Sequence, residues 1–447
     1  MYKFESNFGG QGIDRRSFLR ALGIGASTVA VGGLLAGCAP EAKVSVAPSA
    51  SSSAFKDDGV KAFNFTNWTM AVASGRTLIQ KYIDGYDKSH GTTVTSSSYP
   101  YGKYLEQLIL QIRGGQISGA FQLDISWLTA VGALGKFADL SSFVKDAGYA
   151  DYALKTGQFD GKQVGLPWTT GAIGMVANSE LLEKAKIGED PKTLEDFEEV
   201  LRALKGLGSD VVPYAAMTKV DNLKDIVPWM WAFGSPVVKD DKITVGDEPS
   251  IDALIWYKKM YDEGLIGKDL NRVDARALFG QGKVGVYEDA PSARQFVTSN
   301  AADKQIGEKL TAFARPLVSG GASKPQALSW GQVICVLEGG EGAFAAAEFA
   351  RYLSSDKPTA IDYFKGAGTP PTTTGALDDT GFTSDGFAKA FATKITPTAK
   401  ADPLWKYPKS ALIYEALATQ VQAVLIDKVT PKAGAEAARQ AMQKLID

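Results

Sequence analysis

The sequence predicts an α/β fold in which mainly parallel sheets are flanked by helices, and two observations carry this prediction. From Val60 onward, strand-like and helix-like segments alternate along the chain, the order that produces parallel sheets. At 447 residues the chain is also too long for one ordinary domain. Its 45% apolar and 22% charged residues are typical of globular proteins. Two α/β lobes therefore fit the sequence better than one very large sheet.

The alternation is clearest in the first part of the chain. We expect a strand over 60–68, a helix with an apolar stripe over 76–89, and a second strand that ends at Pro100. A second amphipathic helix is expected over 101–113, followed by a third strand over 121–127 (FQLDISW). In such a lobe, ligands bind outside the carboxyl ends of the strands. Side chains at these strand ends are therefore the first candidates for a site.

Turn and helix signals mark the later elements. Asp160-Gly161 indicates a tight turn between two short strands, and 172–185 passes from strand to helix. Residues 193–196 (TLED) form a capping box at the start of a helix. Residues 354–381 are rich in Pro, Thr and Gly and are interpreted as a connection near the end of the chain. Further helices are expected over 249–264, 341–354, 410–426 and 431–445.

Few residues are available for catalysis or metal binding. The chain has one histidine, His90, and two cysteines, Cys38 and Cys335, too few for a zinc cluster. A catalytic triad would need His90, which lies in a polar segment before Gly91 and is expected to be a solvated residue at a helix end. The net charge of −2 gives no sign of a nucleic-acid partner. We expect no cofactor and no metal.

The first residues resemble an export signal. Residues 14–20 (DRRSFLR) precede an apolar, glycine-rich stretch over 21–37 and resemble a twin-arginine signal, and Leu-Ala-Gly-Cys38 resembles a lipobox. The alternative is a membrane anchor, for which the stretch is short. We predict that 1–37 is a cleaved signal peptide and that a lipid on Cys38 holds the exported protein at the cell membrane.

The signal has consequences for the next segment and for the second cysteine. Residues 38–58 are the lipidated cysteine and a flexible Ala/Ser/Pro-rich tether with a reach of roughly 25 Å. With Cys38 lipidated, Cys335 has no cysteine partner. It lies in a strand-like apolar run (QVICVLEGG) and is expected to be a buried core thiol, with a reactive thiol as the alternative.

Five short patterns follow one another in a recognisable order. They are 159–187 (FDGKQVGLPWTTGAIGMVANSELLEKAKI), 229–267 (from WMWAFGSP to EGLIG), 276–291 (RALFGQGKVGVYEDAP), 366–373 (GAGTPPTT) and 424–443 (VLIDKVTPKAGAEAARQAMQ). In this order and behind a lipoprotein signal, they resemble the extracellular sugar-binding lipoproteins of ABC importers. This is bacterial solute-binding protein family 1, the group that includes maltose-binding protein, and the resemblance covers about residues 60–447.

The resemblance implies a two-lobed, periplasmic-binding-protein-like (type II) fold with a ligand cleft between the lobes. The chain crosses between the lobes more than once in this family. The resemblance implies that lobe one consists of residues 60–167 plus 290–355 and that lobe two consists of residues 168–289 plus 356–447. Several crossing strands then form a hinge.

Acidic side chains at strand ends are candidates for the hydroxyl groups of a sugar. Asp124 ends the third strand in lobe one, where the family often places a ligand-facing aspartate, and its alternative role is a helix N-cap. Glu288 and Asp289 follow a strand in a turn that faces the cleft or hinge in the family, or that is simply solvated.

Tryptophan rings are candidates for the C–H faces of a sugar. Trp229 and Trp231 share one face if their segment is extended, and Trp330 precedes Gly331, where backbone can approach a ligand closely. Each ring is alternatively a core residue, but we expect at least two to line the cleft. The candidates are Trp68, Trp127, Trp168, Trp229, Trp231 and Trp330 with Gly331.

The sequence therefore predicts a monomeric, non-enzymatic receptor that captures a sugar by hinge closure and delivers it to an ABC permease with its ATPase subunits. One alternative is a receptor for a polyamine or other small cation, held by acidic and aromatic groups. A second is a glycosidase-like enzyme using Asp124 and Glu288. A third is a receptor that signals or adheres instead of feeding an importer.

Overall fold

The computed structural model describes residues 56–220, 223–320 and 324–447. The predicted signal peptide, Cys38 and nearly all of the tether lie outside the described residues. The described residues all belong to one unit, 53–447. No helix within them is both long and apolar enough to cross a membrane.

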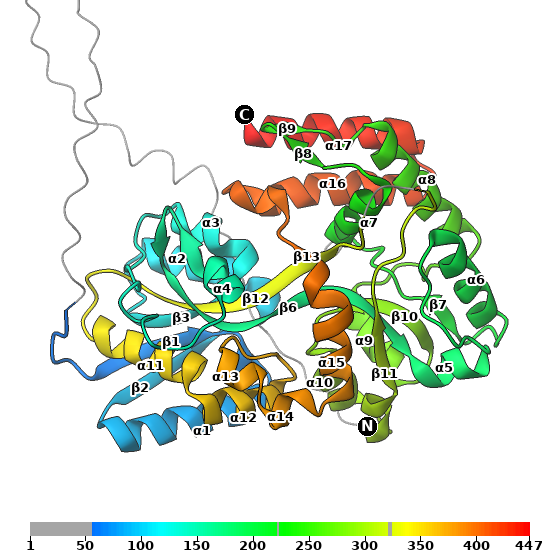
Figure 1. Ribbon diagram of the computed structural model, residues 1–447. Coiled ribbons are helices and arrows are strands. Elements are labelled where there is room, and N and C mark those ends of the chain that lie inside the picture. The colour runs from blue at the N-terminus through cyan, green and yellow to red at the C-terminus, as the bar shows by residue number, and fades with distance from the viewer. Residues whose placement is uncertain (1–55, 221–222, 321–323) are drawn as a thin grey trace, which may run out of the picture. The chain divides into compact units, whose positions relative to one another are not determined.

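One nine-stranded sheet organises the described residues, in the order β2-β1-β3-β12-β6-β10-β7, with β11 paired to β6 and β13 to β12 (Figure 1). β1 runs parallel to β2 and β3, β7 to β10, and β12 to β13. β6 and β12 pair antiparallel with each other and with their other neighbours, β10, β11 and β3. The strands are β1 Ala62–Asn67, β2 Thr93–Ser98, β3 Gly119–Asp124, β6 Gly165–Asn178, β7 Val212–Tyr214, β10 Val284–Asp289, β11 Leu310–Phe313, β12 Ala327–Val336 and β13 Ala399–Lys400.

Helices flank this sheet, so the predicted α/β class is confirmed (Figure 1). The long ones begin and end where sequence signals placed them. α1 ends at Gly91, which takes a left-handed φ of 64°, and α6 begins with a capping box formed by Thr193 and Asp196. The main helices are α1 Ala73–His90, α2 Tyr101–Arg113, α6 Leu194–Lys205, α8 Glu248–Asp262, α11 Ala343–Ser355, α16 Ser410–Leu425 and α17 Pro431–Ile446.

Shorter elements connect these helices and strands. Asp160 and Gly161 both take positive φ in the turn between β4 Gln158–Phe159 and β5 Lys162–Gln163, which confirms the predicted tight turn. β8 Val238–Lys239 and β9 Lys242–Ile243 form a second hairpin. The other short helices are α3 Leu128–Gly132, α4 Asp151–Leu154, α5 Ser179–Lys184, α7 Ile226–Phe233, α9 Arg272–Gly280, α10 Ala293–Asn300, α12 Lys357–Ala367, α13 Thr374–Leu377, α14 Thr380–Thr383 and α15 Gly386–Ala390.

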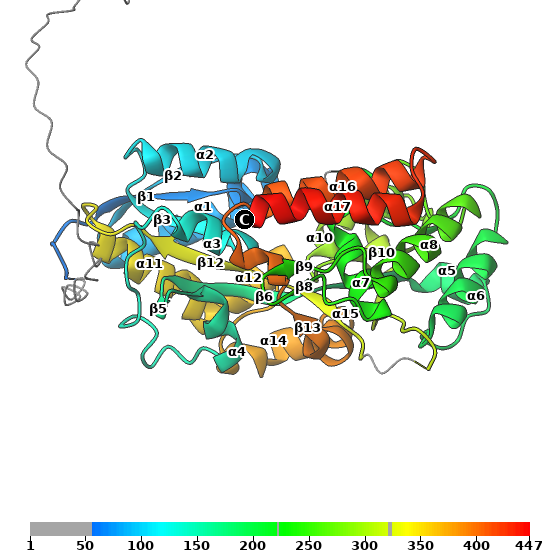
Figure 2. The same cartoon turned by 90° about the horizontal axis from the view of Figure 1, so that it is seen from above.

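The buried apolar side chains form two main groups. The first core draws its members from 63–168 and 333–367, and the second core from 172–328 and 387–442. In the second core, α16 and α17 lie side by side (Figure 2). All residues of β6 are buried, and this strand contributes Leu166 to the first core and Met175 to the second. β6 therefore joins the two cores through its backbone.

The packing differs from the expected lobe ranges at two segments. α10 and β11, expected in lobe one, pack in the second core, where Val297 and Ala312 are fully buried. Tyr363 of α12, expected in lobe two, packs in the first core.

The Pro/Thr/Gly-rich connection over 354–381 contains helices that sequence analysis did not predict, because α12, α13 and the start of α14 lie there. The Asp356 side chain accepts a hydrogen bond from Thr359 N at 3.0 Å and Pro358 occupies the first turn, so α12 begins with ordinary start signals.

Candidate functional site

Asp124 ends β3 and its carboxylate is engaged on both oxygens. Oδ1 accepts from Ser126 N at 2.9 Å and from Ser126 Oγ at 2.7 Å, so Asp124 caps the short 3-10 helix Ile125–Trp127. Oδ2 accepts from the Tyr101 hydroxyl at 2.9 Å. The capping role anticipated as an alternative is therefore present, and the carboxylate also fixes an aromatic side chain of α2.

Three rings with partial exposure gather around Asp124, and we call Trp68, Tyr101 and Trp127 the aromatic group. The Trp68 ring lies edge-on to Tyr101 and Trp127, with centroids 5.4 Å and 5.7 Å away. Tyr101 and Trp127 lie 4.9 Å apart with 30° between their planes. The Tyr101 side chain remains 46% exposed. These rings offer apolar faces next to a carboxylate.

The end of β10 carries Glu288 and Asp289, and neither is a solvated turn residue. Glu288 is 2% exposed and accepts from the Tyr214 hydroxyl at 2.7 Å and from Arg315 Nη1 at 2.6 Å. Asp289 is fully buried, and its carboxylate accepts hydrogen bonds from Nε and Nη2 of Arg276, each at 2.7 Å. The solvated-turn reading is therefore wrong, because both carboxylates end a buried strand and are satisfied by arginines.

The charge of Asp289 is maintained by its arginines. Burial acts to raise the pKa of this carboxyl, but Arg276 and Arg272 outweigh burial, so its pKa lies below the ordinary value. Both arginines come from α9, which Asn271 caps through Val273 N and Asp274 N. Arg272 forms an ion pair with Asp225 and donates to the backbone oxygen of Glu288 at 3.3 Å.

Tyr101 connects the two sets of side chains electrostatically. Burial by the surrounding protein and the charge of Asp124 raise the pKa of its hydroxyl well above the ordinary value, while Arg272 and Arg276 act in the opposite direction. We call the aromatic group with Asp124, together with Arg272 and Arg276 of α9, the candidate site.

Three predicted tryptophans lie in the cores. Trp168 is 2% exposed and stacks on Tyr363 at 4.5 Å in the first core. Trp229 and Trp231 are equally buried in the second core. They do not share a face, because their segment forms α7 and not an extended strand, so two positions along the chain correspond to roughly opposite sides of a helix.

Trp330 and Gly331 lie in the middle of β12, opposite Gly171 and Thr170 of β6. Trp330 is half-buried against the second core. A Cβ atom on Gly331 would lie 2.8 Å from the Thr169 carbonyl oxygen, so close strand packing explains this glycine without a ligand.

Sequence reasoning missed Tyr101, Arg272, Arg276 and Trp405. Tyr101 follows Pro100 at a strand-to-helix junction, the signal used for Asp124, and could have been found in that way. The arginines gave no local signal, since their partners lie 47 and 13 residues away in sequence. Trp405 is half-buried and packs against both cores.

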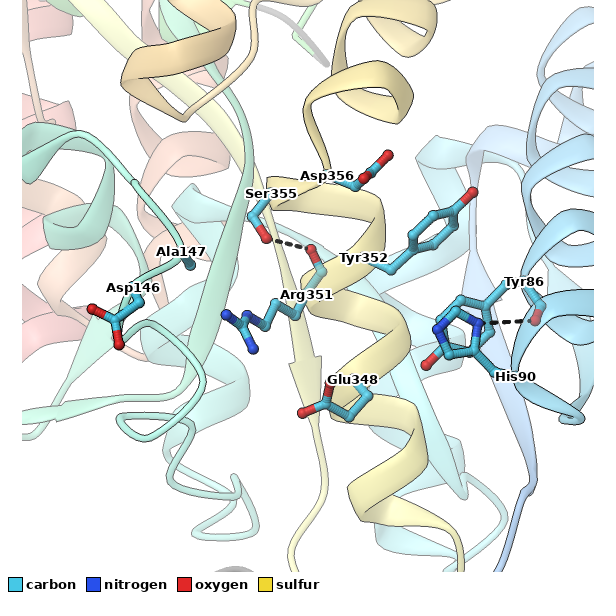
Figure 3. Close-up of a pocket in the computed structure, with 9 residues that line it drawn as sticks. All are labelled: Tyr86, His90, Asp146, Ala147, Glu348, Arg351, Tyr352, Ser355 and Asp356. Carbon is cyan, nitrogen blue, oxygen red and sulfur yellow. Dashed lines mark hydrogen bonds between the residues drawn. The ribbon is translucent and has the colours of Figure 1, made fainter.

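Two surface hollows are lined by residues outside the candidate site. One, of about 340 Å³, is lined by residues of α1, α11 and the 146–147 loop, and Figure 3 shows Arg351 extending toward Asp146 and His90 lying against Tyr86. His90 is exposed at the end of α1, as expected, with its ring 4.0 Å from that of Tyr86. The other hollow, of about 670 Å³, lies between α10, β11 and α15. Neither is lined by a predicted ligand-binding residue.

The described residues also test the prediction for Cys335. Cys335 is fully buried, and burial raises the pKa of its thiol well above the ordinary value, so the core-thiol prediction is confirmed. No group of three or more His, Cys, Asp or Glu side chains within the described ranges is placed to hold a metal ion.

Comparison with curated proteins finds relatives among bacterial binding proteins and lipoproteins. Lipoprotein LipO of Bacillus subtilis is 29% identical over 244 residues, covering 48% of each chain. The diacetylchitobiose binding protein DasA of Streptomyces coelicolor is 26% identical over 248 residues, 53% of this chain and 56% of that protein. The chain thus spans about half the length of the curated relatives it matches.

Solved structures show the same fold. The GacH receptor of Streptomyces glaucescens, solved unliganded and with acarbose, superposes with a TM-score of 0.76 at 19% identity. The match covers 87% of this chain and 99% of that receptor.

The family model of bacterial extracellular solute-binding proteins matches residues 81–390, well over half of the chain. The protein therefore belongs to the family of bacterial extracellular solute-binding proteins.

Proposed function

We propose that this protein is the receptor of an ABC importer and that it captures a sugar at the candidate site. The observation that carries the proposal is the aromatic group around Asp124 at the end of β3. Sugars present C–H groups on their faces and hydroxyls on their edges. Exposed rings beside a carboxylate match both surfaces.

Relatives support a sugar as the ligand class. One relative is named for binding diacetylchitobiose and one structural neighbour was solved with acarbose. The fold, the family and the ligands of these two proteins all favour capture of a carbohydrate over other solutes. Trp168, Trp229 and Trp231 occupy core positions, and Trp330 packs against the second core. The proposal therefore takes Trp68 and Trp127 as its ligand-facing tryptophans.

The acidic groups argue against a polyamine. A polycation needs carboxylates that lack a protein cation, but Glu288, Asp289 and Asp225 are each paired with an arginine. Of these four carboxylates only Asp124 has no arginine partner, since it accepts neutral donors from Tyr101 and Ser126. A single such carboxylate does not match the two or more cationic groups of a polyamine, so a neutral polyhydroxyl ligand fits this charge balance better.

The same contacts argue against a glycosidase. Such an enzyme would use Asp124 and Glu288 as its two carboxylic acids. Glu288 is buried, and Tyr214 and Arg315 occupy one of its oxygens, so it is poorly placed to exchange a proton with substrate. We therefore propose a binding protein without catalytic residues.

Capture is proposed to proceed by closure of two lobes that correspond to the first and second cores. β6 and β12 run through both and provide the hinge, with a register shift between Gln332 and Val333. A lipid on Cys38 would hold the monomeric receptor at the membrane, and a relative named as a lipoprotein supports this. The loaded receptor would then deliver sugar to a permease and its ATPase subunits.

A thermal-shift screen of the exported part, residues 39–447, tests the proposal. Mono- and oligosaccharides, polyamines and amino acids are compared, because a ligand that binds only the folded state raises the unfolding midpoint. We expect a shift with one sugar series and no product by chromatography. A shift with polyamines alone would contradict the sugar, and turnover of a bound sugar would contradict the non-enzymatic role.

A further inference from the structure

Trp405 contacts both cores of the protein although it belongs to only one of them. It lies in the 3-10 helix Pro403–Lys406, and its half-buried side chain packs against the second core and also against the part of the first core around α3. The 403–406 segment itself contacts α3. α3 contributes Leu128 and Val131 to the first core.

The segment that carries Trp405 is fixed to the second core. Leu404 is fully buried there, and Asp402 caps the segment by accepting from Leu404 N at 2.9 Å. Asp241 lies in the turn of the β8–β9 hairpin. Its carboxylate accepts hydrogen bonds from Lys406 Nζ at 2.5 Å and from the Tyr407 hydroxyl at 2.9 Å. The segment is therefore held on the second core while the indole ring extends to the first.

The contact lies beside the candidate site. α3 starts directly after Trp127, the last residue of the 3-10 helix that Asp124 caps. A change in the position of α3 relative to the second core would thus change the distance between the aromatic group and the arginines of α9. A side chain that fixes α3 also fixes the two halves of the site with respect to each other.

We propose that Trp405 is a positioning residue that holds the first core against the second core in the absence of ligand and thereby sets the affinity of the candidate site. The ring limits how far the two halves of the site separate in the ligand-free protein, so a smaller movement remains when the lobes close on a ligand. A receptor whose binding-competent arrangement is more populated binds its ligand more tightly in proportion to that population. The effect on affinity rests on the proposed function, whereas the effect on the arrangement of the cores does not.

Small-angle X-ray scattering of the purified, ligand-free protein tests the arrangement directly. We expect Trp405→Ala to increase the radius of gyration, because the cores separate when the bridging ring is lost. Trp405→Phe keeps an aromatic ring and should stay near the wild-type value. Phe233→Ala is the control, because Phe233 is a half-buried aromatic residue of α7 that packs against the second core and lies outside the segment that carries Trp405. An unchanged radius in Trp405→Ala, or an equal increase in Phe233→Ala, would overturn the proposal.

Affinity for the sugar found in the screen gives the second readout. We expect Trp405→Ala to raise Kd about tenfold, with Trp405→Phe close to wild type. If Trp405→Ala fails to fold by far-ultraviolet circular dichroism, Trp405→Leu replaces it in both measurements. If Trp405→Ala expands but no sugar binds even to the wild type, the proposed function is refuted and the positioning role of Trp405 stands. Normal Kd in an expanded variant would refute the link between this contact and affinity.

Discussion

The Asp124 carboxylate joins a structural and a recognition role in one residue. One oxygen ends β3 by capping the next turn, and the other holds the Tyr101 hydroxyl beside the aromatic group. A carboxylate oxygen has lone pairs for more than one donor, so a sugar hydroxyl can share Oδ2 with Tyr101. Loss of this side chain should therefore affect binding more than it affects folding.

We expect Asp124→Ala to weaken sugar binding more than tenfold, because a hydrogen bond to a charged group contributes about 1.5–3 kcal/mol. Stability should fall by only about 1 kcal/mol, the usual effect of a lost N-cap. Calorimetric titration and thermal unfolding measure the two quantities separately. Asp303→Ala is the matched control, since Asp303 caps another 3-10 helix by accepting from Gln305 N at 2.9 Å. Unchanged affinity in Asp124→Ala would remove this residue from the site.

Local signals predicted some positions of the candidate site and could not predict others. The end of β3 was predictable because a polar residue followed a short apolar run. Trp229 and Trp231 were placed wrongly because a short run of apolar residues fits a buried helix as well as a strand. The ion pairs of Arg272 and Arg276 depend on how α9 packs against β10 and the segment before α7, which no single stretch of sequence reveals.

At the scale of elements, α9 is tied to β10 by a buried pair. Asp289 on the strand receives Arg276 from the helix through two nitrogen–oxygen contacts of 2.7 Å. Breaking a buried pair leaves an uncompensated charge, so we expect Asp289→Asn to lower the free energy of unfolding by about 3 kcal/mol near neutral pH. Asp190→Asn, which breaks an exposed pair with Lys394, should have little effect.

The loss of unfolding free energy in Asp289→Asn should depend on pH, because the pKa of Asp289 is lowered in the folded protein. A carboxyl whose pKa is lower in the folded than in the unfolded state stabilises the protein above its unfolded pKa of about 3.9. The gap in unfolding free energy between wild type and Asp289→Asn should be constant above about pH 5 and should shrink as pH falls below about 4. Chemical denaturation at several pH values measures it. A gap that widens on acidification would contradict the assignment of Asp289 as the ionised partner.

Helix prediction succeeded where an apolar stripe and end signals coincided. α2 and α16 begin where their stripes predicted. α12 was not predicted because the segment was interpreted from its Pro, Thr and Gly content as a connection, although Asp356 and Pro358 start the helix and Gly368, with a φ of 68°, follows its last residue. Composition over a long window therefore concealed a helix of ordinary construction.

At the scale of the whole described body, the exchange of strands between cores was beyond local sequence reasoning. β11 pairs with β6 across more than one hundred and thirty intervening residues, from Leu310 to Asn178, and this pairing places α10 and β11 in the second core. Tyr363 reaches the first core through its stack with Trp168. Such long-range pairings follow from the tertiary fold and not from the periodicity of either partner.

The shared sheet gives a prediction for unfolding. β6 is buried along its whole length and pairs with β12, β10 and β11, so neither core can unfold without exposing a strand of the other. We expect one cooperative thermal transition of the ligand-free protein, although chains of this size often unfold in several steps. In differential scanning calorimetry, the calorimetric and van't Hoff enthalpies should agree. Tryptophan fluorescence, which reports Trp168 in the first core and Trp229 in the second, should change at the same midpoint as far-ultraviolet circular dichroism. Two resolved heat peaks would show that the cores unfold independently, and β6 would then be a flexible connection and not a shared structural strand.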